Sequence, residues 1–334
     1  MMSGATTSFR YQPVQDQLHS CLNLIYIPPM ASIPLRPFGT TGVQVAALGL
    51  GGYHLGLIKT RREAIRLVQA AIDAGITFLD NAWEYHDGES ETRMGSAIAD
   101  RRDGVFLMTK VCTHGRDAKV AMRQLEESLR RLRTDHLDLW QVHECVYDSD
   151  PDLHFARGGV IEALDRAKRQ DKVRFVGFTG HENPAIHLAM LAHDYPFDSC
   201  QLPLNCFDGT FRSFERDVLP VLVSRGIAAI GMKSLGGTGE PAKKRALGAR
   251  DALRYAMSLP VATTVSGIDS VRILKQNLQV ARGFRPFTPA QMESARRKVS
   301  GLAADGRFEL YKTTANFEGP IGRAVHGYPG LGQT

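Results

Sequence analysis

Short apolar segments alternate with longer amphipathic segments along most of the chain. Eight apolar segments have the length of a buried strand, at 45–50, 76–80, 105–111, 137–143, 173–178, 200–205, 227–232 and 262–267. Eight amphipathic segments have the period of a helix, at 61–74, 91–101, 116–132, 157–170, 183–193, 213–225, 247–258 and 270–283. The alternation predicts strand-helix units that pack as a parallel sheet covered by helices.

Eight such units predict one α/β domain, a (β/α)8 or TIM barrel, over residues 34–334. A doubly wound open sheet is the second fold that the pattern allows. The glycine-rich segment 48–56 does not favour it, because the dinucleotide-binding fingerprint GxGxxG started at Gly49 requires glycine where His54 stands.

The two ends of the chain differ from this repeat. Thr288, Pro289 and Gln291 predict the start of a C-terminal helix, with a loop extension after it. Residues 1–29 carry only two charges, Arg10 and Asp16, and show no helical or strand period. We therefore expect residues 1–33 to be a disordered or non-native extension. A targeting peptide is disfavoured because the start is not basic and the apolar stretch is short.

Charge and cysteine content restrict the class of protein. The net charge of +6 is spread over interleaved acidic and basic residues, which favours an anionic small molecule as ligand and disfavours nucleic acid. Five cysteines without CxxC spacing indicate reduced thiols, so we expect a cytoplasmic protein. No apolar run approaches the roughly 20 residues of a membrane span. The sequence carries no signal for a particular oligomeric state.

Four polar residues stand at the ends of neighbouring predicted strands. Asp80 and Tyr85 follow the second strand, Lys110 lies in the last turn of the third, and His143 closes the fourth. Active sites of (β/α)8 barrels lie at the carboxyl ends of the strands. A lysine cation lowers the pKa of a nearby phenol, an aspartate keeps that lysine charged, and a histidine can orient a carbonyl oxygen. The set suits carbonyl reduction, although each residue alone also fits a structural role.

With these residues the chain resembles the aldo/keto reductase family. The resemblance rests on FLDNAWEYH (78–86), VFLMTK (105–110) and SLRRLRTDHLDLWQVHE (128–144). It implies an enzyme that reduces an aldehyde or ketone with NADPH or NADH. Tyr85 would be the general acid, Lys110 and Asp80 would tune it, and His143 would position the substrate carbonyl.

The resemblance also implies positions that bind an extended nicotinamide cofactor. They are Gly52, Tyr53 and Asp80 near the first loop and the nicotinamide ribose, Thr179 and Gln201 at the carboxamide, Met232 against the nicotinamide, Lys233, Leu235 and Gly237 along the pyrophosphate, and Gly267, Arg272 and Asn277 around the adenine nucleotide.

Two of these regions depart from the family pattern. Gly180 stands where many members have asparagine, and Met232 replaces an aromatic residue that stacks on the nicotinamide. His181 could compensate for the missing asparagine, or it could cap the helix that begins near Asn183.

The choice between NADPH and NADH depends on a possible 2'-phosphate site. Cationic side chains normally hold this phosphate. The positions of the family's usual basic residues are Gly267 and Ile273, and Asp269 is nearby, but Arg272 and Lys275 flank them. The resemblance favours NADPH and leaves NADH open.

Two other classes of function remain compatible with the sequence. The chain could be a redox sensor or regulatory subunit that binds the cofactor with little turnover. It could also be a zinc hydrolase, because Cys112 with His114 and His143 with Cys145 are pairs separated by one residue. The absence of a nearby carboxylate cluster in the sequence, and the role of His143 in the reductase set, favour a site without metal.

Substrate specificity in such barrels lies on loops. The candidate segments are Trp83, His86, residues 144–156 and residues 308–319, which are rich in aromatic residues. They suit an apolar or aromatic carbonyl compound, or they pack the mouth of the barrel.

Overall fold

Eight parallel strands close into a barrel, in the order β10-β3-β4-β5-β6-β7-β8-β9. They are β3 (Leu48–Gly51), β4 (Phe78–Asp80), β5 (Phe106–Val111), β6 (Leu137–Val142), β7 (Val173–Thr179), β8 (Ser199–Pro203), β9 (Ala228–Met232) and β10 (Thr263–Gly267). The structure, a computed structural model, describes residues 32–112, 116–314, 317 and 319. It confirms the predicted barrel and excludes the open sheet; the expected extension lies outside the described residues except for its last two positions.

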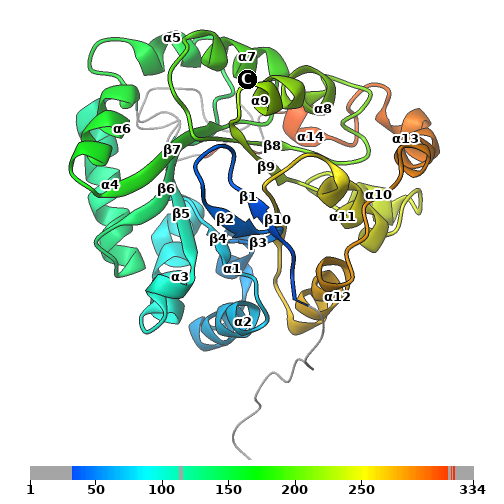
Figure 1. The fold of residues 1–334 in the computed structure, drawn as a ribbon, viewed down its shortest axis with the longest axis horizontal. Helices are drawn as coiled ribbons and strands as arrows, with labels where there is room; N and C mark the ends of the chain where they lie inside the picture. The colour runs from blue at the N-terminus through cyan, green and yellow to red at the C-terminus, as the bar shows by residue number, and fades with distance from the viewer. Residues whose placement is uncertain (1–31, 113–115, 315–316, 318, 320–334) are drawn as a thin grey trace, which may run out of the picture.

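An antiparallel hairpin, β1 (Leu35–Pro37) and β2 (Gln44–Ala46), precedes the barrel. Figure 1 shows it in dark blue across the centre of the barrel. The prediction of one strand at 45–50 is therefore wrong, because two strands share this continuous apolar run and β3 begins only at Leu48. Beside the hairpin, Phe38 packs within 5.0 Å of the Phe106 ring, which closes the amino-terminal end of the barrel.

Helices surround the barrel as a ring (Figure 1). The longer ones are α2 (Arg61–Asp73), α3 (Glu89–Ile98), α4 (Ala118–Leu132), α6 (Val160–Arg169), α7 (Pro184–Ala192), α11 (Ala249–Ser258), α12 (Val271–Arg282) and α13 (Pro289–Ala303). Shorter helices are α1 (Tyr53–Leu57), α5 (Asp150–Phe155), α8 (Phe214–Asp217), α9 (Leu219–Ser224), α10 (Glu240–Lys243) and α14 (Leu310–Thr313), with 3-10 turns η1 (Tyr85–Gly88) and η2 (Arg102–Gly104).

Local sequence explains most of these helix boundaries. Thr288 and Gln291 form the predicted capping box at the start of α13. The helix expected over 213–225 is divided into α8 and α9 at Val218, because Pro220 lies in the first turn of α9 and lacks the N–H that a continuous helix would use. None of the helices in the described part of the chain is long and apolar enough to cross a membrane.

The core has two layers. One lies inside the barrel at its amino-terminal end and includes Phe38, Phe78, Phe106, Leu139 and Phe175. The larger layer lies between the strands and the surrounding helices. Aromatic packing therefore fills one end of the barrel, and the polar residues at the carboxyl ends of the strands occupy the other.

Candidate active site

The structure brings together the four residues predicted at the strand ends. Lys110 on β5 donates from Nζ to Asp80 at the end of β4 and, over 2.7 Å, to the carbonyl of Asn81. Its Nζ lies 5.2 Å from the ring centroid of Tyr85. The Tyr85 ring in turn meets the ring of His143 edge-on, with centroids 5.6 Å apart. A phenol, a buried ion pair and an imidazole thus share one site.

The expectation that Lys110 lowers the pKa of Tyr85 is wrong. Burial raises the pKa of Tyr85 well above its usual range, and the charges of Asp80, Glu144 and Glu84 raise it further. Lys110 does not offset this, because its charge is paired with Asp80. Tyr85 is therefore protonated at neutral pH, as a proton donor must be.

Two glutamates to which the sequence analysis gave no individual role flank His143. Glu84 Oε1 lies 2.7 Å from Nδ1, a close contact without hydrogen-bond alignment, and Glu144 Oε1 lies 4.0 Å from Nε2. Burial raises the pKa of Glu84 to about 7 and lowers that of His143 to about 3. His143 is therefore neutral at physiological pH. The sequence does carry one signal for these glutamates: Glu84 directly precedes Tyr85, and Glu144 directly follows His143.

Of the two zinc pairs considered from the sequence, the structure describes only His143 with Cys145, and it does not bring these two together at one site. Cys145 is buried in the core between strands and helices, and His114 lies outside the described residues. Among the described residues, the only group close enough to hold a metal is Glu84, His143 and Glu144, with ligand atoms within 4.8 Å of one another. One member of this group, His143, packs edge-on against Tyr85, the candidate proton donor.

The predicted carboxamide residues lie on neighbouring strands. Thr179 on β7 pairs in register with Gln201 on β8, and both are buried. Gln201 Oε1 has no hydrogen-bond partner among the described residues. A buried acceptor without a donor favours a ligand that brings one, such as a carboxamide. Met232, half-buried at the end of β9, offers a polarizable thioether in place of an aromatic ring.

Lys233 follows Met232 with a left-handed φ of 54°. Its Nζ lies 5.5 Å from the centroid of the Tyr311 ring and 5.6 Å from that of Phe317. Burial lowers the pKa of Lys233 to about 8, although the charges of Glu144 and Asp80 act in the opposite direction. Next along this loop, Leu235 is half-buried and Gly237 is exposed with a φ of 78°.

The predicted adenine end lies at β10 and α12. Gly267 closes β10, and a Cβ added there would lie 2.2 Å from the ring of His54. Asn277 is buried and donates to Ser266 Oγ over 2.9 Å, so its side chain is already engaged. Arg272 and Lys275 are exposed on α12, and no ion pair joins either one to another described residue.

Gly52 joins the first loop to the site. Its N–H donates to the carbonyl of Asp80 over 2.7 Å, and its own carbonyl accepts from Ser90 Oγ over 2.6 Å. A Cβ at position 52 would lie 2.7 Å from the Asp80 carbonyl, so only glycine fits. Beside it, Tyr53 is half exposed, and its ring meets the Tyr85 ring edge-on at 5.4 Å.

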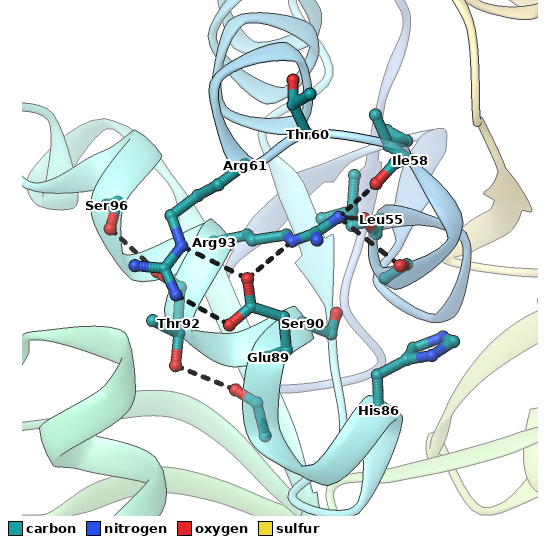
Figure 2. A network of polar contacts seen from close by, with 12 residues as sticks. Leu55, Ile58, Thr60, Arg61, His86, Glu89, Ser90, Thr92, Arg93 and Ser96 are labelled. Atoms are coloured by element: carbon teal, nitrogen blue, oxygen red, sulfur yellow. Dashed lines mark hydrogen bonds and ion pairs between the residues drawn. The ribbon is translucent and has the colours of Figure 1, made fainter.

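Arg93 on α3 fixes the segment that follows Tyr53 (Figure 2). Its Nη1 donates to the carbonyls of Leu55 over 2.6 Å and Ile58 over 2.7 Å. Its Nε donates to Glu89, which also binds Arg61. The guanidinium is therefore a bridge between α3 and the loop over the predicted cofactor site.

The structure explains the departure at Gly180 and excludes one of the two roles considered for His181. A Cβ at Gly180 would lie 2.3 Å from the carbonyl of Cys145, so asparagine does not fit without a backbone shift. The capping role of His181 is wrong, because Asn183 caps α7. His181 instead places Nδ1 3.0 Å from the carbonyl of Tyr311 on α14.

The predicted specificity segments have different surroundings. Trp83 donates from Nε1 to Glu127 on α4 over 2.7 Å, which ties its ring to the helix layer. His86 places Nε2 2.8 Å from the carbonyl of Tyr53. Residues 144–156 contain α5 and residues 308–319 contain α14; these segments bring Glu144 and Tyr311 to the site.

Comparisons of the sequence and of the structure with known proteins both find aldo/keto reductases. The family model described as the aldo/keto reductase family matches residues 47–251. L-galactose dehydrogenase of Arabidopsis thaliana is 30% identical over 217 residues, which cover 62% of this chain and 66% of that protein, just under two thirds of its length. The uncharacterized oxidoreductase YqkF of Bacillus subtilis is 26% identical over 321 residues, which cover 83% of this chain and 98% of that protein. The holo form of an aldo-keto reductase from Bacillus halodurans superposes with a TM-score of 0.67 at 23% identity. The superposition covers 83% of this chain and 99% of that structure.

Proposed function

The chain belongs to the aldo/keto reductase family, and we propose that it reduces an aldehyde or ketone to an alcohol, reversibly, with NADPH as hydride donor. The observation that supports this most directly is the arrangement of Tyr85 between the Lys110–Asp80 pair and His143 at the carboxyl ends of β4, β5 and β6. It supplies a proton donor, a fixed cation and a neutral hydrogen-bonding imidazole around one point.

The residues present fit a nicotinamide cofactor. Gln201 Oε1 is a buried acceptor that needs a donor, which a carboxamide provides. The ammonium of Lys233 interacts electrostatically with Glu144, Lys110 and Asp80, and it also lowers the pKa of His54. A pyrophosphate there would be bound by that cation. Arg272 and Lys275 are free to take a 2'-phosphate, which supports NADPH, while NADH remains the alternative.

The protein's own groups handle the proton and the orientation. The bound cofactor supplies the hydride that forms the new C–H bond at the carbonyl carbon. With Glu84 protonated beside Nδ1 of neutral His143, the ring hydrogen is on Nε2, which donates a hydrogen bond to the carbonyl oxygen and keeps its proton. Tyr85 then gives its phenolic proton to that oxygen as the alcohol forms. Lys110, held by Asp80, stabilises the phenolate that remains.

The decisive experiment follows NADPH and NADH oxidation with a panel of aldehydes and ketones, for wild type and Tyr85→Phe. Turnover that falls by several orders of magnitude in the variant while NADPH still binds supports the proposal. NADPH binding without turnover on any carbonyl compound favours the redox-sensor alternative instead. Zinc in stoichiometric amount by elemental analysis would favour the hydrolase alternative.

A further inference from the structure

Beyond the catalytic residues, Glu144 and His181 form a second polar pair at the mouth of the barrel. Glu144 follows His143 directly and has a left-handed φ of 53°. Successive side chains of a strand point to opposite faces, so this conformation is what turns Glu144 to the same side as His143. Left-handed backbone is uncommon for residues other than glycine and is concentrated at functional sites.

Glu144 keeps one carboxylate oxygen available. Oε2 accepts from the backbone N–H of Gly319 over 2.8 Å. Oε1 lies 4.0 Å from His143 Nε2 and 3.8 Å from His181 Nε2. The structure shows no hydrogen bond to Oε1 from any residue that it describes.

His181 presents a second acceptor to the same space. Its Nδ1 lies 3.0 Å from the carbonyl of Tyr311, which can only accept, so Nδ1 carries the hydrogen. With hydrogen on Nδ1, Nε2 can act as an acceptor, and it has no partner among the described residues although His181 is only 3% exposed. His181 Nε2 is therefore a buried acceptor without a donor, and Glu144 Oε1, 3.8 Å away, accepts from no described residue, so a ligand with donors would remove a desolvation cost.

The local charges indicate which donors fit. Asp80 is paired with Lys110, and the negative charge of Glu144 lies near the ammonium of Lys233. These four charges cancel, and the remaining carboxyl group, Glu84, has a pKa raised to about 7, so the site does not strongly favour a cation. Hydroxyl groups are the neutral donors that satisfy both acceptors. Because Glu144 Oε1 is 4.0 Å from the imidazole nitrogen that would hold the carbonyl oxygen, such a hydroxyl belongs to a carbon beside the carbonyl.

We propose that Glu144 and His181 select carbonyl substrates that carry hydroxyl groups on the carbons next to the carbonyl, a polyhydroxylated aldehyde or ketone. The proposal rests on the proposed reductase function and specifies its substrate class. It replaces the apolar or aromatic compound suggested by the loop composition, because the buried acceptor His181 Nε2, with Glu144 Oε1 beside it, disfavours a substrate that cannot donate.

The test compares glyceraldehyde with propanal, which has the same carbon chain without hydroxyls. Wild type should prefer glyceraldehyde by about 100-fold or more in kcat/KM, since a site built to bind hydroxyls strongly rejects the analogue that lacks them. Glu144→Gln exchanges one acceptor oxygen for a donor, and His181→Asn keeps an N–H for Tyr311 while removing Nε2. Each variant should lower the preference by about tenfold or more. Because every ratio uses the same two compounds, their different hydration in water cancels between proteins.

Glu126→Gln is the matched control, because Glu126 lies on the outer face of α4, where it pairs with Lys172, and its change should leave the preference unaltered. Glycerol should also inhibit wild type at lower concentration than 1-propanol, a comparison that needs no variant. Equal efficiency on the two aldehydes, or an unchanged preference in both site variants, overturns the inference and leaves the reductase function standing. Failure to turn over either aldehyde or any other carbonyl compound overturns the reductase function and this inference with it.

Discussion

At the scale of single residues, Lys233 links the charge state of the site to pH. Its pKa is lowered to about 8 by burial, so the ammonium charge is present below that pH and lost above it. If this charge binds the cofactor phosphates, the Kd for NADPH should rise about tenfold between pH 7 and pH 9. Titration of NADPH by fluorescence at each pH measures this.

Two substitutions separate this effect from other titrations. Lys233→Met should weaken binding at pH 7 and remove the rise in Kd, whereas Lys233→Arg should keep tight binding at pH 9 because arginine stays charged. The same rise in Lys233→Met would assign the titration to another group.

Gly180 tests why this chain departs from the family pattern. Gly180→Asn should lower the free energy of unfolding by about 1–3 kcal/mol, because the new Cβ meets the Cys145 carbonyl at 2.3 Å. Urea unfolding measures the loss. Gly301→Asn is the matched control on α13, where nothing lies within 4 Å of an added Cβ. An equal effect at both positions would contradict the steric explanation.

At the scale of elements, Arg93 fixes the loop after β3 through carbonyls of α1 and its C-cap. Arg93→Met should lower the free energy of unfolding by about 1–3 kcal/mol, because buried carbonyls lose their donor. Amide hydrogen exchange over 53–60 should become faster, and NADPH should bind less tightly. Arg61→Met is the control: this side chain binds the same Glu89 but is 55% exposed, so it should cost less than about 1 kcal/mol. Similar rates of amide hydrogen exchange over 53–60 in both variants would show that Arg93 does not hold this loop against α3.

The same scale shows what sequence could and could not predict. Hydrophobic periodicity located the barrel strands, and strand ends located Asp80, Lys110 and His143, because both depend on local pattern and parallel topology. Periodicity did not separate β2 from β3, since both lie in one apolar run. Glu144 was named only as part of the segment 144–156, because a left-handed φ of 53° reverses the alternation that a strand would impose.

At the scale of the whole molecule, the C-terminal segment completes a site that is otherwise built by the barrel. Tyr311 on α14 accepts from His181 and lies beside Lys233, yet it is 130 residues from His181 in the chain. Neither periodicity nor motif spacing reports such a contact. Sequence therefore predicted the tail as an extension over the barrel, and it did not predict that α14 orients a residue of the site.

A buried ionic group holds α14 in place and provides the test of this arrangement. Lys312 is fully buried and donates from Nζ to Asp208 over 2.6 Å and to the carbonyl of Phe211 over 2.8 Å, with Glu309 at 3.0 Å. Lys312→Met leaves two buried carboxylates without their cation, so the free energy of unfolding should fall by about 3–5 kcal/mol.

The site should change together with stability if α14 orients it. Where Lys312→Met remains folded, as judged by circular dichroism, displacement of α14 removes the acceptor that orients His181, so the preference for glyceraldehyde over propanal should also fall. Lys298→Met, an exposed lysine on α13, should change neither quantity. A destabilised Lys312→Met with the wild-type substrate preference would show that α14 supports the fold without orienting His181, because the loss of its anchor would then leave the acceptor pair intact.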